Sequence, residues 1–169
     1  MVPVQRGRRG PVATGGRCMT HCIPTGTLST VLSTELARAL QVAGLVWEPA
    51  VHDRFVIPGR DLDGQIFALN DLSTEIHEFG TTRAITFNGA VEWSLDWILS
   101  EDVVWVPDEG QLRDALGETF LSLDRCSDGY TCRFRLEGAE VTCTAAGAAE
   151  AYGHALLATM EAARDRRSA

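Results

Sequence analysis

With 169 residues, 45% of them hydrophobic and 22% charged, the chain has the composition of a globular protein and the length for one domain with a real core. Outside residues 1–29, 11 arginines stand against 23 acidic residues, and a body with a net charge near −12 argues against nucleic-acid binding. No apolar run approaches the roughly 18 residues of a membrane span, and no apolar export signal follows the first arginines, so we expect a cytoplasmic protein without membrane association.

Residues 1–29 are predicted to form a flexible tail, because they are rich in Gly, Pro, Thr and Arg and show no periodicity. Within this tail Cys18, His21 and Cys22 are donors that soft metals bind. A structural zinc site needs a second ligand pair, however, and none follows at suitable spacing, so we expect no metal site. The five cysteines are an odd number in a chain large enough to fold without disulfides, which favours reduced thiols.

The first predicted helix spans residues 33–43. Ser33 is a suitable N-cap, apolar residues recur every three or four positions after it, and Gly44 fits a left-handed C-cap. The apolar stripe of this helix should lie on a sheet.

The stretch from Trp47 to Trp105 contains all four tryptophans and most of the strand-like alternation, so we expect it to form the sheet. Gly80 and its neighbours mark a hairpin turn within it. The segment 91–99 fits either a helix or a strand. The predicted strands are 54–57, 66–69, 73–79, 83–88 and 103–106.

Asp108 with Gln111 resembles a capping box, and Leu112, Leu116 and Phe120 then form a stripe that predicts a helix over 108–120, ending by about residue 123. A hairpin of strands 130–136 and 140–144 follows, and an Ala-rich helix over 146–164 ends the chain. Altogether we expect one α+β domain over 30–169, with a mostly antiparallel sheet of five to seven short strands and three helices that cover it.

No catalytic or cofactor motif is present in the sequence. GxxxxGK[ST], GxGxxG, GxSxG and HExxH are all absent, and the chain has no lysine to hold a phosphate. We therefore expect no cofactor, and a non-enzymatic protein is favoured. Cys126 and Cys132 flank a turn, where they either pair under oxidation or act as small hydrophobic residues.

Trp93 and Trp97 should be neighbours on one side of a helix or of a strand, where they either fill the core or form a partner-binding patch. The favoured function is binding of another protein, or of a second copy as a homodimer, because sheet edges need covering or pairing. The alternative is a small-molecule-binding protein or enzyme with a tryptophan-lined pocket. Its polar groups would be Asp53, Arg54, His77 and Asn88, of which His77 either acts in acid–base chemistry or faces solvent.

Three segments carry a resemblance to a known family: LSTELARALQVAGLVWEPAVHDRFVIP, DLSTEIHEFGTTRAITFNGAVEWSLD and VVWVPDEGQLRDALG. Over residues 32–158 the chain resembles short actinobacterial proteins that carry the label pilus assembly protein of the CpaE type. The exclusive use of arginine for all 15 basic residues, typical of a high-GC coding sequence, points to the same kind of source. The MinD-like ATPase of that type requires a Walker loop that this sequence lacks. The resemblance therefore implies a family of similar small proteins, without ATP binding.

Overall fold

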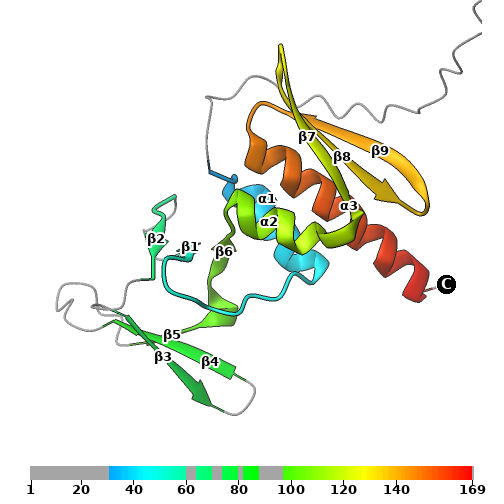
Figure 1. Cartoon of the computed structure of the whole chain (residues 1–169). Coiled ribbons are helices and arrows are strands. Elements are labelled where there is room, and N and C mark those ends of the chain that lie inside the picture. The colour runs from blue at the N-terminus through cyan, green and yellow to red at the C-terminus, as the bar shows by residue number, and fades with distance from the viewer. Residues whose placement is uncertain (1–30, 60–63, 70–73, 80–81, 88–96, 169) are drawn as a thin grey trace, which may run out of the picture.

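The structure is a computed structural model, and it describes residues 31–59, 64–69, 74–79, 82–87 and 97–168. Within these ranges the chain forms three α-helices and nine short strands, which confirms the predicted α+β class (Figure 1). The strands form three antiparallel sheets in the orders β2-β1-β6, β3-β4-β5 and β7-β8-β9, in place of the expected single sheet. Their bounds are β1 Arg54–Val56, β2 Phe67–Ala68, β3 Thr74–Phe79, β4 Thr82–Phe87, β5 Trp97–Leu99, β6 Val104–Val106, β7 Phe120–Cys126, β8 Gly129–Leu136 and β9 Ala139–Ala145. The predicted tail lies outside the described residues, and its boundary stays a prediction.

Helix α1 (Thr34–Ala43) confirms the first predicted helix. The Ser33 hydroxyl oxygen accepts a hydrogen bond from the backbone N–H of Leu36 at 3.4 Å, and Gly44 closes the helix with a φ of 103°. Leu36 and Leu40 are buried, as the apolar stripe indicated.

Helix α2 (Glu109–Leu116) begins with the predicted capping box but is shorter than predicted. Asp108 and Gln111 each accept a hydrogen bond at 2.9 Å from the other's backbone N–H. Gly117 then takes a φ of 53°, and after one 3-10 turn, η2 (Gly117–Thr119), the chain enters β7 at Phe120. The expected helix over 108–120 is therefore wrong beyond residue 116. Phe120 reaches the same core from a strand, with its ring centroid 5.5 Å from that of Tyr152.

The hairpin of β8 and β9 confirms the prediction for residues 130–144. Its turn residues Glu137 and Gly138 both have positive φ angles, 53° and 82°, which suits a tight two-residue hairpin turn. Cys132 and Cys143 lie directly opposite each other in this hairpin, whereas Cys126 lies opposite Gly129. The register thus separates Cys126 from Cys132, and the described cysteines are free thiols.

The larger hydrophobic cluster lies among the three helices, β6 and the β7-β8-β9 sheet. Helix α3 (Ala148–Ser168) packs against β8 and β9 and also contacts α1 and α2, while α1 contacts β6. The helices were expected to cover the sheet of residues 47–105. Instead, α3 covers a sheet formed by residues 120–145, which the long predicted helix had obscured (Figure 1).

A second, smaller cluster lies on the other side of the β2-β1-β6 sheet. It contains Phe55, Ile57 and Val103, with Trp47 packed against it. Val56 and Val104, which alternate with these residues along β1 and β6, belong to the larger cluster. Strands β1 and β6 therefore place apolar side chains in both clusters, and α1 packs against β6.

Candidate functional site

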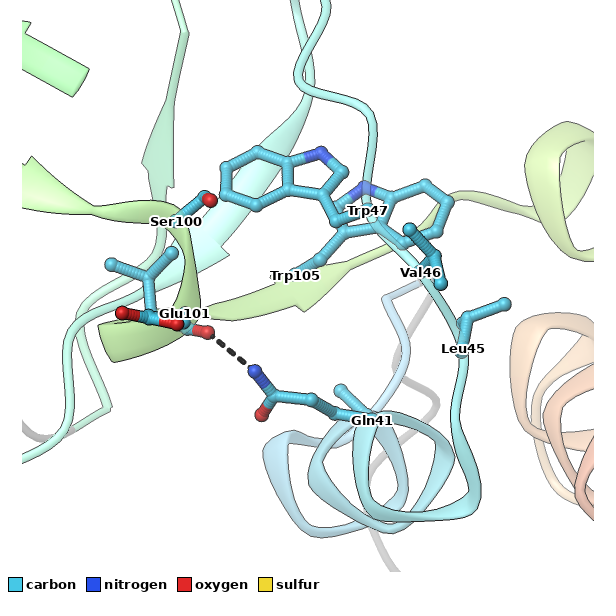
Figure 2. A pocket seen from close by; sticks show the side chains of 9 residues that line it. Gln41, Leu45, Val46, Trp47, Ser100, Glu101 and Trp105 are labelled. Atoms are coloured by element: carbon cyan, nitrogen blue, oxygen red, sulfur yellow. Dashed lines mark hydrogen bonds between the residues drawn. The ribbon is translucent and has the colours of Figure 1, made fainter. Parts of the chain in front are cut away.

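A pocket of about 190 Å³ opens between the end of α1, the segment that follows it and the start of β6 (Figure 2). The helix provides one wall, and its C-cap at Gly44 ends the helix just before the lining segment 45–47. The 3-10 turn η1 (Ser100–Asp102) and β6 provide the other wall. The lining residues are Ala37, Gln41, Leu45, Val46, Trp47, Ser100, Glu101, Val103 and Trp105.

Two stacked tryptophans form the aromatic wall of this pocket. The ring centroids of Trp47 and Trp105 are 6.5 Å apart, with the ring planes 11° from parallel. Trp105 lies opposite Phe55 in the β1–β6 pair, so strand pairing fixes its position, and the ring of Phe55 also contacts Trp47. The buried indole N–H of Trp105 has no hydrogen-bond partner among the described residues. A rigid aromatic surface of this kind provides large contact area at little cost in conformational entropy.

The carboxylate of Asp53 holds Trp47 in place. Asp53 is only 4% exposed, and it accepts hydrogen bonds from the indole N–H of Trp47 at 2.8 Å and from the backbone N–H of Ala50 at 2.9 Å. Its other oxygen accepts from the side-chain amide of Gln111 at 2.5 Å. A buried carboxylate is stable only when its oxygens are satisfied in this way. Asp53 therefore acts on the pocket indirectly, by orienting the indole and the loop before β1.

The other predicted site residues are dispersed over the structure. Arg54 is half-buried in β1 opposite Val106, and His77 is exposed in β3 opposite Ala84, so the two lie in different sheets. Trp97 is the first residue of β5, so residues 97–99 form a strand, whereas the side chain of Trp97 is not among those that the structure describes. Trp93 and Asn88 lie outside the described residues, and their roles stay predictions. Asp53, by contrast, is hydrogen-bonded to a pocket residue, the indole of Trp47.

Sequence reasoning gave no special role to Trp47 and Trp105, the first and last tryptophans of the chain. The signal that distinguishes them is that each stands two residues before a proline, Pro49 and Pro107. Proline restricts the residue directly before it, here Glu48 or Val106, to extended conformations, so the chain next to each tryptophan is extended.

The polar groups at the pocket are few, and the charged one among the lining residues is acidic. Gln41 donates its side-chain amide to the backbone carbonyl of Val103 at 2.9 Å, which joins the helix to the opposite wall (Figure 2). Glu101 lines the pocket, and Glu48 beside Trp47 is exposed. No lining residue is basic, a nucleophilic cysteine or a histidine. The arrangement suits an apolar group that carries a cation next to it, and it lacks the pairing of nucleophile and base that acyl transfer needs.

In the part of the chain that the structure describes, no group of three or more His, Cys, Asp and Glu side chains is placed to hold a metal ion. The tail residues Cys18, His21 and Cys22 fall outside that part. None of the described helices is long and apolar enough to cross a membrane.

Comparison with protein-family models, with curated proteins and with solved structures gives no match for this chain. The resemblance to CpaE-type proteins therefore stays a prediction.

Proposed function

We propose that this protein works by binding another protein, and that the Trp47–Trp105 pocket receives one apolar anchor side chain of that partner. The observation that carries the proposal is the pair of stacked indoles on the wall of a small open pocket. Interfaces depend on a few buried aromatic or apolar anchors that fill such pockets, and they are enriched in tryptophan.

The size of the pocket favours a side chain over a free ligand. Sites for drug-sized ligands measure about 300–1,000 Å³, whereas this pocket measures about 190 Å³. That volume admits a single large side chain and leaves most of a nucleotide or similar cofactor outside. Arg54 and His77, which the small-molecule alternative would place at the pocket, are absent from its lining.

The surface around the pocket supports the same function. Val46 lines the pocket and is 77% exposed, and Val42, near the end of α1, is 73% exposed. A bound partner would cover this exposed apolar surface together with the pocket. Glu101 and Glu48 add negative charge, so the fitting partner segment has an aromatic or large aliphatic residue with an arginine or lysine next to it.

The test is selection from a displayed library of random peptides against the full chain. We expect enriched peptides to share an apolar anchor with an adjacent basic residue. Val46→Glu should then weaken their binding at least about tenfold, because it places a charge where an apolar contact forms, and tenfold corresponds to about 1.4 kcal/mol. Glu101→Gln should weaken peptide binding less than Val46→Glu does, and it should reduce the dependence of peptide affinity on salt concentration.

Val51→Glu is the matched control, since Val51 is also an exposed valine, at 45%, but does not line the pocket. It should leave peptide affinity unchanged. The proposal fails if no peptide is enriched, or if the two valine variants weaken binding equally.

A further inference from the structure

Strand β9 forms an open, regular edge of the β7-β8-β9 sheet. It pairs with β8 over its whole length from Ala139 to Ala145 without a register shift, and among the described strands β8 is its only partner. Figure 1 shows it as the outer strand of the hairpin, with α3 against one face of the sheet. Such an edge presents a row of backbone donors and acceptors to any second strand.

The other edge strands carry protections that β9 lacks. Proteins block edges with short strands, bulges, charges and prolines. β2, β5 and β6 have two or three residues each, β3 contains two glutamates, and β7 has a register shift between Phe120 and Ser122. β9 has seven residues, no proline and one charge, Glu140. Its remaining residues are Val, Thr, Cys and Ala, and the Val and Thr among them favour strands.

The hairpin turn determines which backbone groups of β9 face outward. A two-residue turn is closed by a hydrogen-bonded pair, here Leu136 with Ala139. Hydrogen-bonded and non-bonded pairs then alternate along the ladder, so Val141 and Cys143 bond to β8. The N–H and C=O groups of Glu140, Thr142 and Thr144 therefore point away from β8, toward the open edge.

We propose that two copies of the chain pair antiparallel along β9, centred on Thr142. In this register Thr142 lies opposite Thr142 of the second copy, and Glu140 lies opposite Thr144 of the second copy, so no like charges meet. Threonine pairs across strands are favourable. This centre also uses the full strand, whereas any shifted centre shortens the pairing.

The side chains on the inner face of β9 support pairing with a second copy of the chain. Val141 and Cys143 contact the larger hydrophobic cluster but are only half-buried at the edge. A second β9 would cover them, because it would place Cys143 of the second copy beside Val141. The homodimer is an isologous, closed assembly, since the same strand serves both partners.

Size-exclusion chromatography with light scattering tests the proposal on the full chain over a range of concentrations. We expect the mass to rise toward twice the chain mass of 18.4 kDa as concentration increases. Thr142→Pro should give a monomer that remains folded, because proline removes an outward N–H and leaves the bonds to β8 intact. Thr142→Val keeps that N–H and should dimerise as the wild type does.

Two variants at Thr144 test the register and do not depend on whether a proline is tolerated. Thr144→Glu places like charges opposite each other twice by symmetry and should weaken the dimer about 3- to 10-fold, whereas Thr144→Arg should strengthen it by a similar factor. A wild type that stays monomeric at every concentration overturns the proposal, and it would favour an extended segment of another protein as the strand that pairs with β9. Equal effects of the two Thr144 variants overturn the register.

This proposal is independent of the pocket. Val46→Glu should leave the measured mass unchanged, and Thr142→Pro should leave peptide binding unchanged, so each failure can be assigned to one surface.

Discussion

Replacing Asp53 with alanine tests whether this carboxylate organises the pocket wall. The substitution removes three hydrogen bonds to one buried carboxylate, from Trp47, Ala50 and Gln111. Hydrogen bonds to charged groups contribute about 1.5–3 kcal/mol each. Their sum overstates the loss, because Trp47 is half-buried and its indole N–H regains water when the carboxylate is removed. We expect the free energy of unfolding to fall by about 3–4 kcal/mol, which is large for a single substitution.

Two further variants give the scale for this measurement. Trp47→Phe removes one of the three bonds and retains an aromatic ring, so it should cost about half as much as the Asp53 change. Asp102→Ala removes an exposed acid from the turn beside the pocket and should change stability by less than about 0.5 kcal/mol. Urea unfolding followed by far-ultraviolet circular dichroism suits all three, because tryptophan fluorescence would change with Trp47 itself. If Asp53→Ala costs no more than Trp47→Phe, the three-bond arrangement is incorrect.

Three other predictions concern the larger cluster and its hairpins. Gly129→Ala should lower the free energy of unfolding, measured by thermal melts, by about 3 kcal/mol or more, because Gly129 has a φ of 131° and a Cβ there would overlap a backbone carbonyl of β9. Gly138 has a φ of 82° and open space around it, so Gly138→Ala should cost about 1 kcal/mol, and equal losses in the two variants would contradict the close approach at Gly129. Burial raises the pKa of the Cys132 thiol to about 12, whereas an exposed thiol has a pKa of about 8.5. The buried thiol therefore stabilises the fold fully below about pH 8.5, and this stabilisation is lost as the pH rises from about 9 toward 12. The denaturation midpoint should fall over that pH range, and it should fall less in Cys132→Val. The Glu150 carboxylate accepts a hydrogen bond from the backbone N–H of Ser33 at 2.6 Å, so Glu150→Ala should lower the free energy of unfolding by about 1–2 kcal/mol. Glu150→Gln keeps an acceptor and should lower it less, whereas equal losses in the two variants would mean that only the charge of Glu150 contributes.

The elements that sequence reasoning placed correctly are those with local causes. The N-cap at Ser33, the C-cap at Gly44 and the capping box at Asp108 each involve residues within a few positions of one another. The end of α2 was missed because Leu112, Leu116 and Phe120 have helical spacing whether or not the chain remains helical. Gly117 was the available sign of the break, since its positive φ is a conformation that other residues rarely adopt.

The candidate site was missed for a different reason. Trp47 and Trp105 are far apart in sequence, and they meet because β6 returns to pair with β1. Alternation shows that a strand has two faces, but it does not show which distant strand will pair with it or in what register. Asp53 was among the predicted site residues, yet its partners Trp47 and Gln111 come from elements that only the fold brings together.

The small sheet of β1, β2 and β6 has a consequence for how the protein unfolds. Phe55 and Val103 face one hydrophobic cluster, while Val56 and Val104, their neighbours along the strands, face the other. Neither cluster can lose this wall without exposing the apolar side chains of the other to water. The two clusters therefore share this sheet as a common wall, and we expect them to unfold together, with the pocket built beside that wall.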